Sequence, residues 1–401
     1  MPGPLHGLTV IDMSRVLAGP WAGQLLADYG AEVIKIERPG VGDDTRHWGP
    51  PWLRDTRESA YFQSANRNKR SVTVNLAHPL GQELIRGLVT RSDVLLANYR
   101  VGTLERFCLD AEALCNLNPR LIYCSISAYG QSGSKSQEPG YDAMIQAAGG
   151  LMSITGESDA DGGRPTKVGV AIADIMAGMY AATAVLAALA ERERSGRGQT
   201  IDVPLFDSQV AWLANQAMNY LLTGTAPGRL GSAHPNIVPY QAFQTADGYL
   251  MLAVGNDRQF ADCCEILGRA DVADNPKFST NAARIEHRDE LIGIIAERLI
   301  EETGKHWLER FAARQIAAGP INDLAEVFAD PVVAERQIVR ELQHAQVGVV
   351  PSVANPVRFS DTPVEYRLAP PLLGQHTVEV LKDMLEYSDE QIAKLYDAGA
   401  I

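Results

Sequence analysis

The chain has 401 residues, of which 46% are hydrophobic, so it can form two or three domains with a large buried core. Its net charge of −13 at pH 7 argues against nucleic acids and anionic membranes as partners, because both require a basic surface. The five cysteines form no Cys-x-x-Cys pair, which argues against a thiolate zinc site and a disulfide framework. The first residues do not resemble a secretory signal, so we expect a cytoplasmic protein.

Short β-branched runs alternate with helical stretches in the first half of the chain. The expected strands are Leu8–Met13, Glu32–Glu37, Ser71–Leu76, Asp93–Asn98 and Arg120–Ile126. This alternation predicts the α/β class, with a Rossmann-like, doubly wound parallel sheet. Ligands of such sheets bind beyond the carboxyl ends of the strands, so we expect one rim to be lined by 14–18, 38–46 and 98–102.

The charge distribution also favours this region for an anionic ligand. Residues 1–106 carry 13 Lys and Arg against 11 Asp and Glu, whereas the rest of the chain is strongly acidic. Several arginines and lysines fall at or beyond predicted strand ends, where they could bind phosphate groups: Arg38, Arg46, Lys69, Arg70, Arg100 and Arg106. For each of them, a solvated surface charge is the alternative interpretation.

Residues 168–190 form a long apolar run whose only charged residue is Asp174. The run is rich in Ala, Gly and Met and ends in charged residues, so we expect a buried helix rather than a membrane span. A carboxylate in the first turn of such a helix can stay ionised, because free N–H groups and the helix dipole stabilise its charge. Asp174 is therefore a candidate nucleophile; a structural helix cap is the alternative.

The composition of the sequence changes after residue 223, where Gly, Ala and Pro become frequent. We expect a large domain over 1–223 that is completed by 331–401, and a small inserted domain over 224–330. The small domain should contain a hairpin that turns at Asp247-Gly248.

Other familiar site patterns are missing from the sequence. The eight histidines are scattered without an HExxH pattern, and no GxSxG, GxGxxG or P-loop motif is present. We therefore expect no metal, nicotinamide or flavin.

Several motifs, in the same order along nearly the whole chain, resemble the class III CoA-transferases of the CaiB/BaiF family. They include Ala18-Gly-Pro20, Gly30–Glu37, Asn68–Ser71, Gly140-Tyr-Asp142 and Ala369–His376. The resemblance implies a Rossmann-like large domain, a smaller α+β domain and an interlocked homodimer. It also implies acyl-CoA and a carboxylic acid as substrates.

The resemblance assigns roles to particular residues of this chain. Asp174 matches the catalytic aspartate of the family. The residues that match CoA contacts are Leu17, Ala18, Arg38, Val72, Thr73, Asn75, Asn98, Tyr99, Arg106 and Tyr141. A lysine that the family carries before this tyrosine is replaced by Pro139. Backbone N–H groups near Gly255 and Asn256 match the family's glycine loop and could stabilise an oxyanion.

By analogy, Asp174 attacks a donor acyl-CoA, and the reaction passes through an aspartyl anhydride and an aspartyl-CoA thioester. The segment Ala233–Tyr240 resembles members that take CoA from succinyl-CoA, so we expect a dicarboxylic acceptor such as itaconate, malate or glutarate. One alternative is a 2-methylacyl-CoA racemase of the same fold, but Tyr141 stands where racemases have a histidine. A non-catalytic CoA-binding protein is the other alternative.

Overall fold

The computed structural model describes residues 2–54 and 56–401, which form two compact units. Unit 1 contains residues 1–151, 167–225 and 334–401. Unit 2 contains residues 152–166 and 226–333. The segment 152–166 therefore differs from our expectation, because it packs with unit 2 rather than with the large domain.

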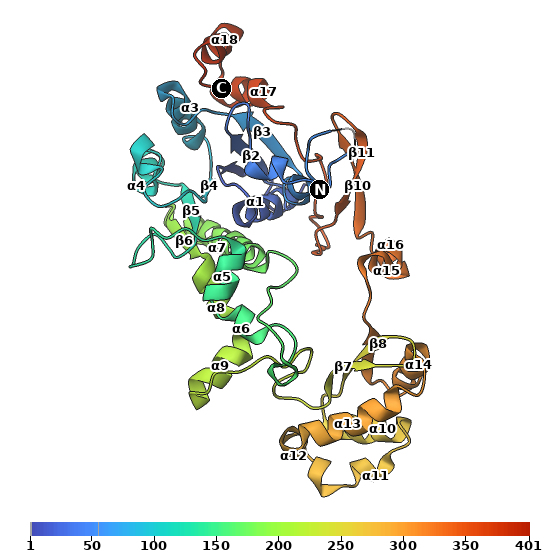
Figure 1. The fold of residues 1–401 in the computed structure, drawn as a ribbon. Helices are drawn as coiled ribbons and strands as arrows, with labels where there is room; N and C mark the ends of the chain where they lie inside the picture. The colour runs from blue at the N-terminus through green and yellow to red at the C-terminus, as the bar shows by residue number, and fades with distance from the viewer. Residues whose placement is uncertain (1, 55) are drawn as a thin grey trace. The chain divides into compact units, whose positions relative to one another are not determined.

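The centre of unit 1 is a six-stranded parallel sheet in the order β3-β2-β1-β4-β5-β6 (Figure 1). Its strands are β1 (Thr9–Asp12), β2 (Glu32–Glu37), β3 (Lys69–Thr73), β4 (Val94–Ala97), β5 (Ile122–Ser127) and β6 (Thr200–Pro204). The predicted α/β class and parallel sheet are confirmed. The strand order reverses between β1 and β4, which is the point where open parallel sheets commonly bind ligands.

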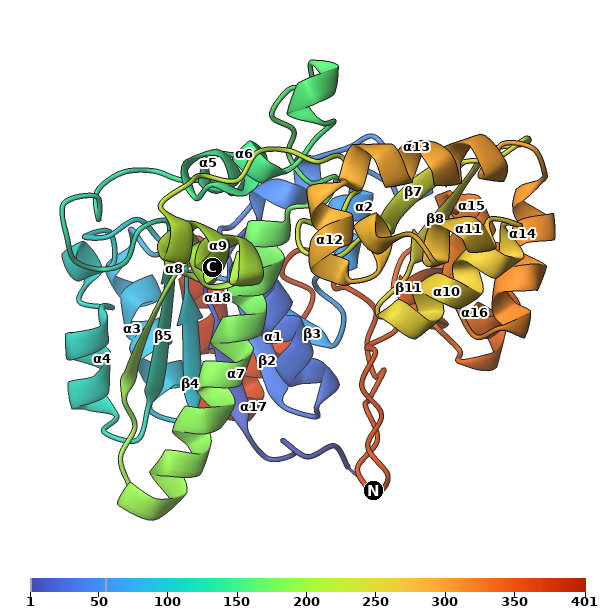
Figure 2. The ribbon, with the colours of Figure 1, turned by 90° about the horizontal axis from the view of Figure 1, so that it is seen from below.

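Successive residues along each strand point to opposite faces of the sheet, and both faces are buried. Ile11 packs in one core with Leu84 and Leu381, whereas Val10 packs in the other with Leu26 and Ala181. The helices on the first face are α3 (Pro79–Val89), α4 (Ala111–Leu117), α17 (Thr377–Leu385) and α18 (Asp389–Asp397). Those on the second face are α1 (Ala18–Asp28) and α7 (Ile172–Ser195), which lie side by side in Figure 2.

Unit 1 also contains shorter elements around the sheet and a two-stranded antiparallel ribbon. These elements are η1 (Asp44–His47), α2 (Ala60–Ser64), η2 (Glu105–Phe107), α5 (Asp142–Ala148), α8 (Leu205–Ala211), α9 (Ala214–Thr223), β10 (Val339–His344) and β11 (Gly348–Val353). The helix α6 (Leu151–Ile154) starts at the end of one unit 1 segment, and α16 (Pro331–Glu335) leads into the last one.

Unit 2 is built on a three-stranded antiparallel sheet, β7-β8-β9. Its strands are β7 (Tyr240–Gln244), β8 (Tyr249–Ala253) and β9 (Ala317–Pro320), so the predicted hairpin at Asp247-Gly248 is confirmed. Its helices are η3 (Asp159–Asp161), α10 (Asp257–Ile266), α11 (Ala270–Ala273), η4 (Pro276–Phe278), α12 (Asn281–Glu286), α13 (Arg288–Leu299), α14 (Gly304–Ala313) and α15 (Leu324–Ala329).

The 24-residue helix α7 is long and apolar enough to cross a membrane by length and composition. Half of its most apolar window is buried inside the protein, and the core helix of a globular domain passes the same test. Its small side chains allow close packing on α1. A Cβ atom added to Gly178 would lie 2.5 Å from the carbonyl oxygen of Ala18.

Candidate active site at the carboxyl edge of the sheet

Asp174 lines a hollow of about 220 Å³ in unit 1, at the carboxyl edge of the parallel sheet. The loop Ser14–Ala18, which we call the rim loop, follows β1 and forms one wall. Other walls come from Asn98–Val101 after β4, Ile126–Ala128 at the end of β5, and Ser136–Tyr141 before α5. Leu17, Ala18, Asn98, Tyr99 and Tyr141 are thus brought to the same hollow as Asp174, although they are distant in sequence.

The Asp174 side chain is a buried acid without a counter-ion in the described part of the chain. The residue is only 8% exposed. Burial, and to a lesser extent the negative charge of Asp142, raise the pKa of Asp174 to about 7. Asp174 is therefore poised to change its charge near neutral pH.

The N-terminus of α7 does not stabilise the Asp174 carboxylate, and our expectation that it would is wrong. Oδ1 of Asp142 accepts hydrogen bonds from the N–H groups of Ala173 at 2.7 Å and Asp174 at 3.4 Å. Oδ2 of Asp142 accepts from Nε2 of Gln146 at 2.7 Å, and Oε1 of Gln146 accepts from the N–H of Val168 at 2.9 Å. Asp142 is thus the acid that uses the favourable end of the helix.

The rim loop leads directly into the N-terminus of α1, which faces the hollow with Asp174. Among the residues described, the N–H groups of Leu17, Ala18 and Gly19 have no hydrogen-bond acceptor. Gly19 permits this tight path, because a Cβ atom there would lie 2.2 Å from Cβ of Ser14. Unpaired N–H groups beside a carboxylic acid provide a place for a developing negative charge on an oxygen.

A second hollow of about 220 Å³ lies beside the first and shares Arg15, Asp44 and Tyr99 with it. Its lining also includes Arg38 and Asn75. No ion pair of Arg38 occurs within residues 2–54 and 56–401, so its guanidinium group is available for a phosphate. The N–H and Nδ2 of Asn75 instead donate to the carbonyl oxygens of Ala400 and Gly399, at 2.8 and 3.1 Å.

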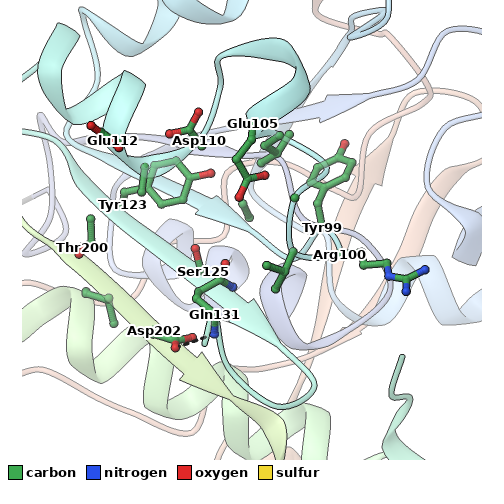
Figure 3. A pocket seen from close by; sticks show the side chains of 16 residues that line it. Tyr99, Arg100, Glu105, Asp110, Glu112, Tyr123, Ser125, Gln131, Thr200 and Asp202 are labelled. Carbon is green, nitrogen blue, oxygen red and sulfur yellow. Dashed lines mark hydrogen bonds between the residues drawn. The ribbon is translucent and has the colours of Figure 1, made fainter. Parts of the chain in front are cut away.

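Figure 3 shows a third hollow, which has a volume of about 300 Å³ and shares Tyr99, Arg100 and Val101 with the hollow of Asp174. Its labelled acids are Glu105, Asp110, Glu112 and Asp202, and Oδ2 of Asp202 accepts the N–H of Gln131 at 2.9 Å. Four carboxylates against one guanidinium group disfavour a phosphate here. Of the three hollows, the one with Arg38 is the best suited to a nucleotide.

The structure does not bring Val72, Thr73 and Arg106 to these three hollows. Val72 is completely buried in the core of the sheet, so its side chain cannot contact a ligand. The N–H of Thr73 donates to Oγ1 of Thr377 at 3.1 Å. Arg106 is exposed on η2. The family resemblance assigned CoA contacts to these residues, but for the two on β3 the strand's pleat and its partners decide which side chains face a ligand.

Three of the six predicted phosphate-binding cations are engaged in ion pairs. Arg46 pairs with Glu37 at 2.7 Å and with Glu58 at 2.9 Å, and Lys69 pairs with Asp12 at 2.9 Å. Arg70 pairs with Glu32, Glu379 and Asp383. Neither the surface-charge nor the phosphate interpretation fits Arg46 and Lys69, because both are buried structural cations.

Sequence reasoning missed two groups of this site. Asp142 was noticed only as part of a motif, and its spacing from Asp174 gave no sign that the two carboxyl groups would meet. Arg15 lies between the first two hollows, where its guanidinium group is 5.3 Å from the Tyr99 ring and pairs with Asp44 at 3.3 Å. Its position directly after the first strand was the available signal.

The glycine-loop segment belongs to unit 2. The N–H of Gly255 donates to Oε1 of Gln259 at 3.0 Å, and Oδ1 of Asn256 caps α10 by accepting the N–H of Gln259 at 2.9 Å. The Gly255 N–H is therefore already used and cannot also stabilise an oxyanion in this conformation. Across the described residues, no cluster of three or more His, Cys, Asp or Glu side chains is arranged to hold a metal ion.

Comparisons with known proteins show which family the chain resembles. Residues 5–377 match the model of CoA-transferase family III. The chain is 47% identical over 385 residues to the succinate–glutarate CoA-transferase of Agrobacterium fabrum, covering 95% of this chain and 96% of that protein. It is 45% identical over 398 residues to the human succinyl-CoA:glutarate CoA-transferase, covering 99% and 90%. A crystal structure of a CaiB/BaiF family protein from Brucella suis has a TM-score of 0.84 at 44% identity, covering 96% of this chain and 100% of that one.

We expect the Asp174→Asn variant to be more stable than the parent above pH 7. Because folding raises the pKa of Asp174 from 3.8 to about 7, the parent loses stability as the pH rises through this interval. At 1.36 kcal/mol per pKa unit, the loss is roughly 2–4 kcal/mol, and an amide at this position avoids it. Urea unfolding at pH 4 and pH 8 measures the difference.

Asp43→Asn is the control of opposite sign. Burial would raise the pKa of Asp43, but Lys35 and Thr45 lower it to about 2, so its charge stabilises the fold above pH 4. This variant should be less stable than the parent at pH 8. Equal stability of the Asp174→Asn variant and the parent at pH 8 would contradict the raised pKa.

Proposed function

Because the chain belongs to CoA-transferase family III, we propose that it transfers CoA from succinyl-CoA to glutarate or a related dicarboxylic acid, with Asp174 as the nucleophile. The observation that carries this proposal is the Asp174 side chain. It is a buried acid with no counter-ion among the residues that the structure describes, and it lines a hollow together with the open N-terminus of α1. The names of two relatives, at 47% and 45% identity, favour the donor and the acceptor.

The proposed reaction begins when a carboxylate oxygen of Asp174 attacks the thioester carbonyl of the donor. The C–S bond breaks, CoA leaves as a thiolate, and a mixed anhydride joins Asp174 to the succinyl group. The thiolate then attacks the Asp174 carbonyl, which releases succinate and forms an aspartyl-CoA thioester. The N–H groups of Leu17 and Ala18, which line this hollow, could hold the negative oxygen of each tetrahedral intermediate.

The acceptor acid repeats these two steps in reverse order. Its carboxylate attacks the aspartyl-CoA thioester and expels the CoA thiolate, which gives a second mixed anhydride. The thiolate attacks the acceptor's carbonyl, the product acyl-CoA forms, and the Asp174 carboxylate is regenerated. No proton is gained or lost over the cycle, and water must be kept out because it would hydrolyse each intermediate. The burial of Asp174 supports this requirement.

The two adjoining hollows suggest how CoA binds. In the proposed pose, the nucleotide occupies the hollow with Arg38, and the pantetheine arm runs past Arg15 and Tyr99 to Asp174. Arg15 and Arg100 are the cations that line the hollow of Asp174, and they are candidates to bind the distal carboxylate of a dicarboxylic acid.

We also propose that a second copy of the chain covers the outer side of α7 and α9. Leu221 and Leu222 of α9 are 70% and 79% exposed, and Met179, Tyr180 and Leu186 of α7 are also exposed. Exposed apolar surface of this kind favours association. Light scattering should give twice the mass of one chain, and a particle with the mass of a single chain would contradict this proposal.

The substrate proposal predicts a specific set of products. With succinyl-CoA as donor, we expect new thioesters with glutarate, itaconate or malate, and none with propionate or butyrate, in a mass-spectrometric assay. Asp174→Asn should lower kcat by at least about 10³-fold, because it removes the nucleophile. Borohydride should trap an adduct on the parent after incubation with succinyl-CoA, but not on the variant.

Two results would contradict this proposal. Undiminished turnover by the Asp174→Asn variant would remove the nucleophile from the mechanism. Epimerisation of a 2-methylacyl-CoA without transfer to any acid would favour the racemase alternative.

Asp142 should set the pH dependence of the transfer. The parent's kcat/KM should fall as the pH drops below about 7, because protonated Asp174 cannot attack. Asp142→Asn removes a neighbouring negative charge, so the acidic limb of the profile should move to lower pH by roughly half to one unit. Asp207→Asn, in the exposed first turn of α8, is the matched control and should leave the inflection unchanged. An unchanged profile for Asp142→Asn would refute this electrostatic role.

A further inference from the structure

Val16, in the middle of the rim loop, has a backbone conformation that its side chain disfavours. Its φ is +69°, in the left-handed region, which β-branched residues rarely adopt. Strain of this kind persists only where surrounding contacts impose it, and it often marks functional sites. Val16 lies in the wall of the hollow that contains Asp174.

The contact on Val16 itself comes from a buried carboxylate. Its N–H lies 3.2 and 3.3 Å from Oδ1 and Oδ2 of Asp43. Nζ of Lys35 donates to Oδ2 of Asp43 at 2.9 Å and to the carbonyl oxygen of Ser14 at 3.0 Å. The side chains of Lys35 and Asp43 are both 0% exposed. The Lys35–Asp43 pair therefore forms hydrogen bonds with the rim loop at two points, the carbonyl oxygen of Ser14 and the N–H of Val16.

Asp43 is itself held in place by the start of η1. Its Oδ1 accepts hydrogen bonds from the N–H and the hydroxyl of Thr45, at 3.0 and 2.8 Å. Its own N–H donates to Oε2 of Glu37 at 2.9 Å. Since Glu37 and Lys35 lie on β2, the Asp43 carboxylate that binds the rim loop is fixed to β2, the strand beside β1.

Arg15, the residue before Val16, is held by Asn98, which follows β4 on the other side of β1. Its N–H donates to Oδ1 of Asn98 at 2.8 Å, and Nδ2 of Asn98 donates to the carbonyl oxygen of Arg15 at 2.6 Å. These bonds fix the residue before Val16 but leave the Val16 N–H to Asp43 alone. Asp43 is thus the only described group that hydrogen-bonds the strained residue's own N–H.

We propose that the Lys35–Asp43 pair is a positioning device, which holds Val16 in its left-handed conformation so that the N–H groups of Leu17 and Ala18 face the reacting carbonyl in the hollow of Asp174. This inference rests on the proposed function for the identity of the reaction. Lys35 and Asp43 act through the rim loop and are positioning residues rather than catalytic ones. Both residues contribute to the lining of the hollow with Arg38, but their side chains are 0% exposed and so have no surface with which to contact a substrate.

A double-mutant cycle separates positioning from general stability. Asp43→Asn should lower kcat/KM for succinyl-CoA about 30-fold in the parent background, because the rim loop relaxes. In the Val16→Gly background the same change should cost less than about 3-fold, since glycine adopts the left-handed conformation without help. The same loss in both backgrounds would overturn the proposal.

Hydrogen exchange gives a readout that does not depend on the reaction. Asp43→Asn should accelerate amide exchange at Val16 at least about 10-fold, whereas unchanged exchange at Val16 would overturn the proposal. An inactive parent would refute the proposed function, and the exchange measurement would still decide the role of Asp43. If Asp43→Asn fails to fold, Asp43→Glu keeps the charge but displaces the carboxylate, and it is put through the same cycle and exchange test.

The matched control is Asp28→Asn. Asp28 is an equally buried carboxylate of unit 1, whose Oδ1 accepts from Nε of Arg67 and Nδ2 of Asn68, both at 2.9 Å, and it lines none of the three hollows. It should lower the melting temperature but leave both kcat/KM and the exchange rate at Val16 within about 2-fold. A drop in kcat/KM and faster exchange as large as those of Asp43→Asn would mean that any lost buried ion pair disturbs the site.

Discussion

The first N–H groups of α7 can stabilise one carboxylate, and the fold gives them to Asp142 rather than to Asp174. Asp174 is then buried with a negative neighbour, and its pKa rises to about 7. A more acidic carboxyl group would be a weaker nucleophile, and one with a much higher pKa would be protonated in neutral solution. Asp142, which accepts the backbone N–H of Asp174, therefore also raises the pKa of the Asp174 carboxyl group through its charge.

Beneath the rim of the hollow, unit 1 buries an unusual amount of charge. Lys35, Asp43, Lys69 and Asp12 are almost completely inaccessible and are paired with one another. Such pairs add little net stability, because desolvation offsets their attraction. Their value lies in geometry: Lys35 of β2 binds Asp43 in the loop after its own strand and Ser14 after β1, and Lys69 of β3 binds Asp12 at the end of β1, two strands away. A parallel sheet collects its ligand-binding loops at one edge, and these charges hold them at fixed distances.

The three hollows around this edge are lined by different charged residues, and these charges determine which ligand each hollow can bind. The hollow with Arg38 suits a phosphate, the one with Asp174 suits an activated acyl group, and the one with four carboxylates suits neither phosphate nor thiolate. Tyr99 and Arg100 separate the acidic hollow from that of Asp174. A CoA thioester could span the first two hollows, with its charged and reactive ends in separate environments.

The sequence by itself predicted five of the six strands of the parallel sheet, the alternating helices, the hairpin of unit 2 and the singular position of Asp174, because alternation, apolar runs and turn residues are local signals. It also gave the family resemblance, through motifs that need no structure to be seen. Only the tertiary structure decided that Asp142 takes the helix N-terminus, that Arg46 and Lys69 are buried ion-pair partners, and that Val72 faces the core. Each of these depends on which side chains meet across the sheet, and desolvation and hydrogen bonding there act between residues far apart in the chain.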